Sequence, residues 1–281
     1  MHHLLFRWFP KRALTRLAGW LAERRRPRPL LRWAIRLYIR IFRIDMAPFA
    51  GGPDSFETFN AFFTRPLRPG RRPIDPDPAA LVSPVDGHVS AAGMIEAGRL
   101  IQAKGRDYGL EALLGGEPAW RDYVGGQYVT LYLAPPDYHR IHAPAACAVT
   151  RYRYLPGEFW GVGASGLASV PRLYERNERL VSFLSGPFGE LALVMVGAMI
   201  VGRIAVVYHR NIVNRRTPAP RAERLAAPYP LEKGAELGRF ELGSSVVLLT
   251  RPGEAALRAL APGDPVRMGQ AIGRIAKPAP K

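Results

Sequence analysis

The stretch Leu191-Ala-Leu-Val-Met-Val-Gly197-Ala-Met-Ile-Val-Gly202 is the longest charge-free apolar run in the body of the chain. It holds twelve residues and is interrupted by Gly197, whereas a helix that crosses a bilayer needs about 20 apolar residues. Short β-branched runs bounded by glycine are typical of strands that are buried on both faces. The stretch therefore predicts a buried strand, a turn and a second buried strand.

The same texture extends outward from this stretch over residues 51–281. Apolar runs recur there between glycines and prolines, of which the 281-residue chain holds 28 and 27. Such punctuation is typical of a β-rich body. We expect strands over residues 81–82, 88–91, 128–133, 148–154, 180–184, 191–196, 204–208 and 246–250, with helices over residues 55–63 and 110–114. The predicted fold class is α+β, with a mainly β body and an N-terminal amphipathic helical segment.

A short internal repeat lies near the C-terminus of the chain. The segment Gly234-Ala-Glu-Leu-Gly-Arg-Phe240 is matched by Gly269-Gln-Ala-Ile-Gly-Arg-Ile275. Repeated patterns at a fixed spacing indicate repeated structure. We expect two similar units, each made of a turn followed by a strand.

Residues 1–50 differ from the rest in charge and in periodicity. They hold twelve Lys and Arg against two acidic residues, so that +10 of the formal net charge of +17 lies there. From residue 30 to residue 44, arginines recur every three or four positions among apolar residues, which predicts an amphipathic helix with a basic stripe. A shorter version covers residues 4–21, and Pro27 and Pro29 separate the two.

This segment is predicted to lie on a membrane, because a basic residue interrupts every apolar stretch before it could span one. Trp8, Trp20 and Trp33 suit the interface, and the basic residues suit anionic head groups. We expect peripheral attachment to the cytoplasmic side of the cell membrane and no nucleic-acid partner. The alternative is that the helices pack on the body and the arginines are simply solvated. A mitochondrial transit peptide fits less well, since residues 1–50 contain no serine.

Cys147 is the only cysteine of the chain. A single cysteine excludes an intramolecular disulfide and a multi-cysteine zinc site, and it suits a reducing compartment. We interpret Cys147 as a small buried apolar residue.

Three polar islands stand out in the apolar body: residues 83–88, residues 137–142 and residues 242–245. Between them they supply Asp86, His139, His142 and Ser244, the residue types of a relay in which a carboxylate holds a histidine that activates a serine. A conventional hydrolase is one interpretation, but the chain has no G-x-S-x-G elbow.

A metal pair of His139 and His142 would need a helix, which the prolines at positions 135, 136 and 144 disfavour. Each island also has a purely structural explanation: a turn at Asp86-Gly87, a hairpin loop at Gly243-Ser244, and histidines that are hydrogen-bonded in the core.

In these islands the sequence resembles the bacterial and mitochondrial, pyruvoyl-dependent type of phosphatidylserine decarboxylase. The resemblance covers roughly residues 56–275, with five motifs in the family's order. Beyond the islands, the matching motifs are residues 59–68 with 72–75, residues 102–105 with 110–114, residues 176–179 and residues 240–244. One departure is Ser245, where the family usually has threonine; a hydroxyl is kept there, so we expect processing to survive.

The resemblance implies a self-cleaving proenzyme. Ser244 would attack the carbonyl of Gly243, His142 would take the proton, and Asp86 would orient that histidine. Cleavage would leave a large β chain (residues 1–243) and a small α chain (residues 244–281), which stay together as a heterodimer. Ser244 would become a covalent pyruvoyl cofactor, and no metal is implied.

The resemblance also implies the reaction of the mature enzyme. The pyruvoyl ketone would form a Schiff base with the amine of phosphatidylserine and accept electrons as CO2 departs, giving phosphatidylethanolamine for phospholipid biosynthesis. His139 is the candidate proton donor, with Tyr138 helping to place it. A higher homo-oligomer is possible. Two alternatives stay open: a pyruvoyl decarboxylase of another substrate, and a lipid-binding homologue that never matures.

Overall fold

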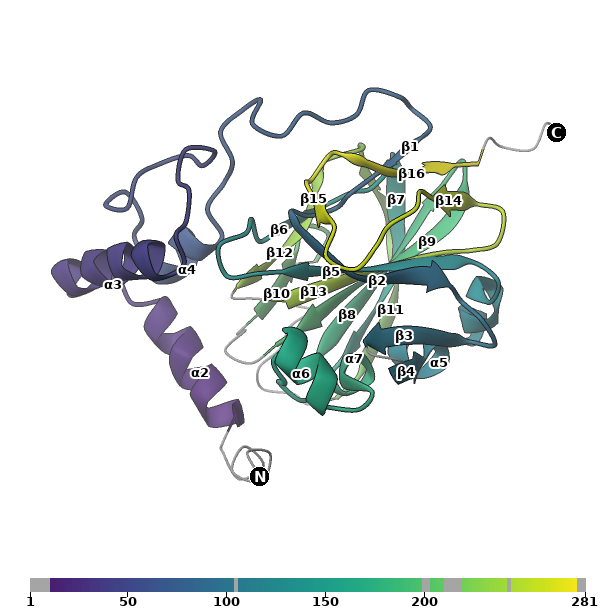
Figure 1. Cartoon of the computed structure of the whole chain (residues 1–281), viewed down its shortest axis with the longest axis horizontal. Helices are drawn as coiled ribbons and strands as arrows, with labels where there is room; N and C mark the ends of the chain where they lie inside the picture. Colours follow the sequence, from purple (N-terminus) through teal and green to yellow (C-terminus); the bar gives the residue numbers. More distant parts are fainter. Residues whose placement is uncertain (1–10, 104–105, 199–202, 210–218, 242–243, 277–281) are drawn as a thin grey trace.

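The protein is described by a computed structural model that covers residues 11–103, 106–198, 203–209, 219–241 and 244–276. A mostly β body carries a helical N-terminal arm, which we define as residues 11–46 (Figure 1). This arrangement confirms the α+β class and the mainly β body that the sequence predicts.

The body is built on one antiparallel sheet of eight strands in the order β11-β7-β8-β9-β13-β5-β2-β15. The central strands carry almost continuous apolar sequence because both of their faces are buried. Their bounds are β2 Gly87–Met94, β5 Gln127–Leu133, β7 Cys147–Leu155, β8 Arg179–Gly186, β9 Gly189–Gly197, β11 Arg221–Leu231, β13 Ser244–Thr250 and β15 Pro265–Val266.

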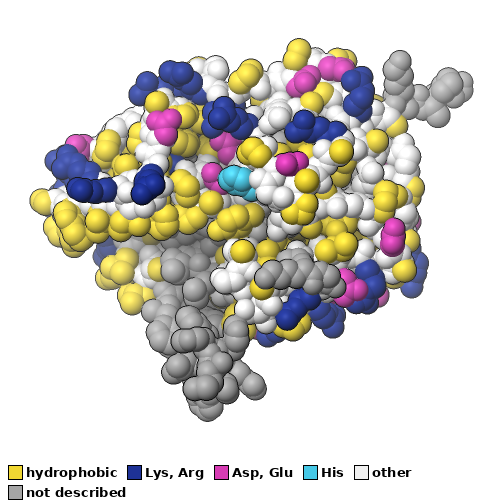
Figure 2. Space-filling view, viewed as in Figure 1, with side chains coloured by type: hydrophobic (Ala, Val, Ile, Leu, Met, Phe, Trp, Pro, Cys, Tyr) yellow, Lys and Arg dark blue, Asp and Glu magenta, His cyan; other side chains and the backbone are white. Residues whose placement is uncertain are grey.

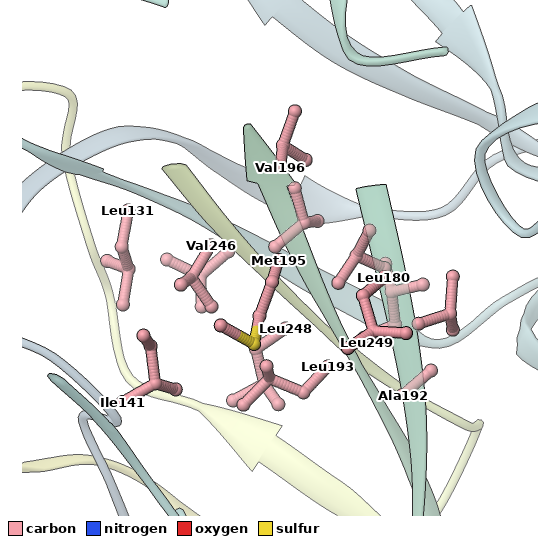
Figure 3. Packing of buried hydrophobic residues seen from close by; sticks show 14 of the residues in the cluster. Leu131, Ile141, Leu180, Ala192, Leu193, Met195, Val196, Val246, Leu248 and Leu249 are labelled. Atoms are coloured by element: carbon pink, nitrogen blue, oxygen red, sulfur yellow. The ribbon is translucent and has the colours of Figure 1, made fainter. Parts of the chain in front are cut away.

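Strand β13 lies in the middle of this sheet, between β9 and β5. Residues 246–249 are fully buried, and Leu193 and Met195 of β9 pack beside Val246 and Leu248 (Figure 3). The register pairs Ser244 with Gly197 on one side and with Leu133 on the other. The first residue of β13 therefore lies where β5 and β9 end.

Three smaller sheets flank the large one. One has the order β10-β12-β6, a second has the order β1-β16-β14, and the third is the β3-β4 hairpin. Their bounds are β1 Ala80–Val82, β3 Arg99–Ala103, β4 Arg106–Gly109, β6 Arg140–His142, β10 Arg203–Val206, β12 Glu236–Glu241, β14 Ala255–Leu257 and β16 Ala271–Ile275.

The two repeated segments, residues 234–240 and 269–275, each form a turn followed by a strand, as predicted. Gly234 and Gly269 have φ angles of 80° and 86°, a region that favours glycine, and they lead into β12 and β16. A Cβ on either glycine would lie within 2.8 Å of Ile74. Both turns therefore close on the same side chain.

Short helices connect the strands. Their bounds are α4 Phe59–Phe63, α5 Leu110–Leu113, η1 Pro118–Tyr123, α6 Ala164–Ser169 and α7 Leu173–Arg176. The helix predicted over residues 55–63 begins later, at Phe59, because the Thr58 hydroxyl caps it by accepting a hydrogen bond from the Ala61 amide. The strand predicted over residues 204–208 is β10, after which the chain turns. Of the stretch 191–202, residues 199–202 lie outside the described part of the chain.

The arm consists of α2 Lys11–Ala22 and α3 Arg28–Ile41. Ile35 is buried against Phe62 of α4, and the Asn60 amide donates to Glu23 at 2.9 Å. On its other side, α3 presents a band of apolar side chains to solvent (Figure 2). Trp33 and Ile41 are 60% and 62% exposed. None of the described helices is both long and apolar enough to span a bilayer.

Candidate active site

The three polar islands meet at one end of the eight-stranded sheet. Ser244 begins β13 and pairs with Leu133, the last residue of β5. Residues 134–139 follow β5 directly, and Asp86 precedes Gly87, the first residue of β2. The antiparallel register thus brings Asp86 and Ser244, which are more than 150 positions apart in sequence, to the same end of the sheet.

Only the backbone of Ser244 is described, and Gly243 lies outside the described residues. The expected cleavage bond therefore falls at the entry into β13. The backbone of Ser244 lies between the ends of two neighbouring strands, β5 and β9.

Asp86 is held by an arginine and by a backbone amide. Arg72 donates from Nε to Oδ1 at 2.9 Å and from Nη2 to Oδ2 at 2.5 Å, and the Met268 amide donates to Oδ1 at 2.9 Å. This hydrogen bonding raises the pKa of Arg72, so the guanidinium keeps its charge. Gly87 makes the approach of β2 to β5 possible, because a Cβ there would lie 2.4 Å from the Tyr132 carbonyl oxygen.

His142 is buried, and both of its ring nitrogens are engaged. The carbonyl oxygen of Gly234 lies 2.8 Å from Nδ1, and the Tyr138 hydroxyl lies 2.9 Å from Nε2. A carbonyl only accepts, so Nδ1 carries the proton and Nε2 accepts from Tyr138. Burial lowers the pKa of His142, which leaves the ring neutral and Nε2 without a proton.

The carboxylate of Asp86 affects His142 through its charge, which acts to raise the pKa of the imidazole against the effect of burial. The hydrogen bonds that fix the ring come instead from Gly234 and Tyr138. Direct orientation of His142 by Asp86, as the resemblance implies, stays a prediction.

His139 is fully buried, and its Nδ1 donates to the Asp137 carbonyl oxygen at 2.8 Å. Its ring contacts Phe63, with a centroid separation of 4.1 Å. Burial lowers the pKa of His139 to about 3, so the ring is neutral at physiological pH. The Nε2 atom is buried and has no hydrogen-bond partner within the described part of the protein. Such an orphaned acceptor fits a reacting group that binds beside it.

Arg65 fixes the loop that carries His139. It is fully buried, lies 4.0 Å from the Phe49 ring centroid, and donates to the Pro136 carbonyl at 2.7 Å and to the Asp137 carbonyl at 3.5 Å. The Asp137 carbonyl thus accepts from both Arg65 and His139. Burial lowers the pKa of Arg65 to about 10, so the side chain keeps its charge at neutral pH.

Sequence reasoning gave no role to Arg65, to Arg72 or to the Gly234 carbonyl. Both arginines fall inside quoted motifs, which was the only signal available for them. A backbone carbonyl leaves no signal in residue type. Cys147 lies in β7 and is only half-buried, so the full burial expected from the sequence is wrong. Its surroundings nevertheless raise the pKa of its thiol to about 12 by desolvation, which keeps it protonated and unreactive.

Comparison with known proteins places the chain in a family. The family model for phosphatidylserine decarboxylase matches residues 59–274. A phosphatidylserine decarboxylase proenzyme of Anaeromyxobacter sp. (strain K) is 48% identical over 273 residues, which cover 96% of each chain. Proenzymes of the same name from Pseudomonas fluorescens and Myxococcus xanthus are 43% and 40% identical, over 94% and 96% of this chain and 93% and 97% of theirs. A family model that matches most of the chain and relatives of this identity and coverage show that the chain belongs to the phosphatidylserine decarboxylase family.

Proposed function

We propose that this protein cuts its own Gly243–Ser244 bond and then decarboxylates phosphatidylserine to phosphatidylethanolamine and CO2. The proposal rests on the pairing of Ser244 with Leu133 at the end of β5, because the chain that follows Leu133 carries two buried, neutral histidines, His139 in the loop and His142 in β6. Relatives of nearly full-length similarity bear the name proenzyme, which supports processing into two chains.

For the cut, Ser244 Oγ attacks the carbonyl carbon of Gly243 and an ester replaces the peptide bond. His142 Nε2 is the base, because its neighbour Nδ1 already carries the proton. The Tyr138 hydroxyl occupies Nε2, so it either relays the proton or moves aside. β-Elimination then breaks the ester, and loss of ammonia from the new N-terminus on hydrolysis leaves a pyruvoyl group at position 244.

The pyruvoyl carbonyl supplies the electron sink for decarboxylation. His139 suits the proton-transfer step, since its free Nε2 is buried near the end of β5. Its ring is neutral at rest, so it must gain a proton before it can donate one. An entering anionic substrate would raise the pKa of His139 and favour that gain.

The two chains are expected to stay together after the cut. The α chain (residues 244–281) supplies β13, which is paired on both sides with strands of the β chain (residues 1–243). Separating them would expose four fully buried side chains of β13, Val246 to Leu249, at about 1.5–3 kcal/mol each.

The arm supports peripheral binding to an anionic membrane surface at the cytoplasmic face of the cell membrane. Its exposed apolar side chains and its excess of arginines match an interfacial helix. Such binding would bring the sheet edge to a substrate that resides in the membrane.

Intact mass after purification tests the self-cleavage. We expect two chains, with the smaller one resistant to Edman sequencing because its N-terminus has no amine, and a single chain for Ser244→Ala. A single uncut wild-type chain would contradict the proposal. Release of CO2 from phosphatidylserine and from free serine then separates the lipid enzyme from a pyruvoyl enzyme of another substrate.

A further inference from the structure

The motif Arg176-Asn-Glu-Arg179 holds the end of β9 that lies beside Ser244. Gly197, the last residue of β9, is the register partner of Ser244. The Gly197 amide donates to the Glu178 carbonyl oxygen at 2.8 Å, and the Gly197 carbonyl oxygen accepts from the Asn177 side chain at 2.8 Å. Both backbone groups of Gly197 are therefore bonded to the motif.

This hydrogen bonding determines where the Cα–H bond of Ser244 points. The N–H and C=O groups of a strand residue point to the same side, so those of Gly197 point away from β13. Gly197 and Ser244 thus form a pair without mutual hydrogen bonds, in which the two Cα atoms lie about 4.5 Å apart. In such a pair each Cα carries its hydrogen toward the other strand. The Cα–H bond of Ser244 therefore points toward β9.

The carboxylate of Glu178 lies above this contact. Glu178 is buried, and its Oε2 lies 3.8 Å from the place that a Cβ on Gly197 would occupy. The Tyr154 hydroxyl donates to the other carboxylate oxygen, Oε1. Because residue 197 is glycine, β9 places no side chain of its own between the carboxylate and Ser244.

Glu178 and the two histidines approach Ser244 from different neighbouring strands. His139 and His142 belong to the chain that follows β5, whereas Glu178 is bonded to the end of β9, on the other side of β13 (Figure 1). Self-cleavage removes two protons from Ser244, one from Oγ when the ester forms and one from Cα when β-elimination breaks the ester. His142 is the base for the first. The second needs a base on the side of β9.

We propose that Glu178 is the base of the β-elimination step, an inference that rests on the proposed function. Its carboxylate takes the Cα proton of Ser244, the electrons of that bond form the Cα–Cβ double bond, and the Cβ–Oγ bond breaks. Gly243 leaves as a carboxylate with the electrons of the broken bond, so no other reactant is needed. Tyr154, which donates to Oε1, is a positioning residue for the carboxylate.

Glu178→Gln tests the proposal, because the amide keeps the size of the side chain and an acceptor for the Tyr154 hydroxyl but is not a base. Ester formation should continue, so this variant should hold the ester in equilibrium with the intact peptide, at the mass of the uncut chain. Hydroxylamine at neutral pH cleaves esters and spares peptide bonds. We expect it to release residues 244–281 with an N-terminal serine that Edman sequencing reads.

Three further variants serve as controls in the same assay. Ser244→Ala and His142→Ala are blocked before the ester forms, so hydroxylamine should cut neither. Glu190→Gln is the matched control, because Glu190 is also buried and accepts from a tyrosine hydroxyl, that of Tyr123, but lies at the opposite end of β9. It should mature as the wild type does.

Glu178→Asp separates chemistry from packing. It keeps a carboxylate, so it should mature about a hundredfold more slowly, as expected when a catalytic group is displaced by one methylene. In protein made by cell-free synthesis with α-deuterated serine, its cut should slow further, because the affected step breaks the Cα–H bond. A purely structural role for Glu178 would produce no such isotope effect.

The outcomes separate this inference from the proposed function. Normal maturation of Glu178→Gln, a folded and uncut Glu178→Gln chain that resists hydroxylamine, or no isotope effect in Glu178→Asp would overturn the role of Glu178. The wild type would still mature in all three cases, so the proposed function would stand. An uncut wild-type chain would contradict the proposed function and this inference together.

Discussion

The arm and the body differ in what they do with apolar side chains. The body buries them completely, as with residues 191–196 of β9 and residues 246–249 of β13. The arm leaves many of them exposed, including Trp20, Trp33 and Ile41 at 52–62%. An exposed apolar band of this kind does not stabilise a fold in water, and such bands mark surfaces that contact a partner or a membrane. The difference therefore indicates that the body folds around its own core and that the arm has a contact surface.

The largest difference between variants of the body and variants of the arm is expected in the extent of self-cleavage. His142→Ala removes the proposed base and should abolish the cut, since no other group takes over the Gly234 and Tyr138 contacts. A triple arm variant, Leu30→Ser with Trp33→Ser and Ile41→Ser, should cut as completely as the wild type. Intact mass measures both, and cutting by His142→Ala would remove this histidine from the maturation step.

Stability should divide along the same line. In the uncut Ser244→Ala background, Leu193→Ala should lower the free energy of unfolding by about 2–5 kcal/mol, because it empties a fully buried site between β8 and β13. Trp33→Ala should change it by less than about 0.5 kcal/mol. Urea unfolding gives both values. A large cost at Trp33 would mean that the arm is part of the core.

Membrane binding should show the opposite pattern. The triple arm variant removes three exposed apolar side chains, each worth on the order of 1 kcal/mol when partly buried in an interface. We expect its affinity for anionic vesicles to fall about a hundredfold, whereas Leu193→Ala should not change it. Co-sedimentation with vesicles measures this, and undiminished pelleting of the triple variant would assign the contact to the body.

A lower pH should reduce the free energy of unfolding of the body but should leave membrane binding by the arm unchanged. The folded-state pKa of His139 is about 3, below its unfolded value of about 6.5, so the folded state binds fewer protons in that window. The stability that this provides is complete above pH 6.5 and is lost as the pH falls toward 3. At pH 5 we expect a loss of about 2 kcal/mol from this histidine.

Unfolding of the uncut protein at pH 7 and pH 5 tests this, with His139→Gln as the matched variant whose pH dependence should be smaller by that amount. Vesicle binding by the arm should change little over the same range, since its basic residues are eleven Lys and Arg, residue types that ordinarily titrate above pH 10. An identical pH slope for His139→Gln would contradict the burial argument.

Arg65 joins the two parts, and its variants should show the smallest effect. It follows α4, which supports the arm, and it donates to the loop that carries His139. Arg65→Lys keeps the charge but loses the forked geometry, so we expect about a tenfold lower kcat with normal self-cleavage. Guanidinium ion should restore kcat in Arg65→Ala if the residue acts by positioning the loop. Absence of both effects would make Arg65 a structural residue only.

The sequence predicted β5, β8, β9 and β13, which have mainly apolar runs, and β7, in which arginines alternate with tyrosines. It missed β11 Arg221–Leu231 because that strand is almost entirely exposed and contains two prolines, so no alternation marks it. Strands β6, β14 and β15 have only two or three residues each. Their pairing depends on partners elsewhere in the chain, which local patterns do not record.

The candidate site could be predicted as far as residue type and family motif reach. Asp86, His139, His142 and Ser244 were found because they fall in three short polar islands that also match motifs of the family. The partners that hold them were not found. Arg72 lies 14 residues before Asp86, and Gly234 lies 92 residues after His142 and contributes only a carbonyl. Tertiary packing, and not local sequence, brings them together.

The central position of β13 has a consequence for the order and reversibility of maturation. Both of its neighbours, β5 and β9, precede the expected cleavage bond in the chain. While the chain is continuous, refolding is unimolecular. Once it is cut, two separate molecules must meet again, so the recovery of the fold depends on protein concentration. Maturation would therefore convert a fold that can be rebuilt after unfolding into one that, at low concentration, is assembled only once.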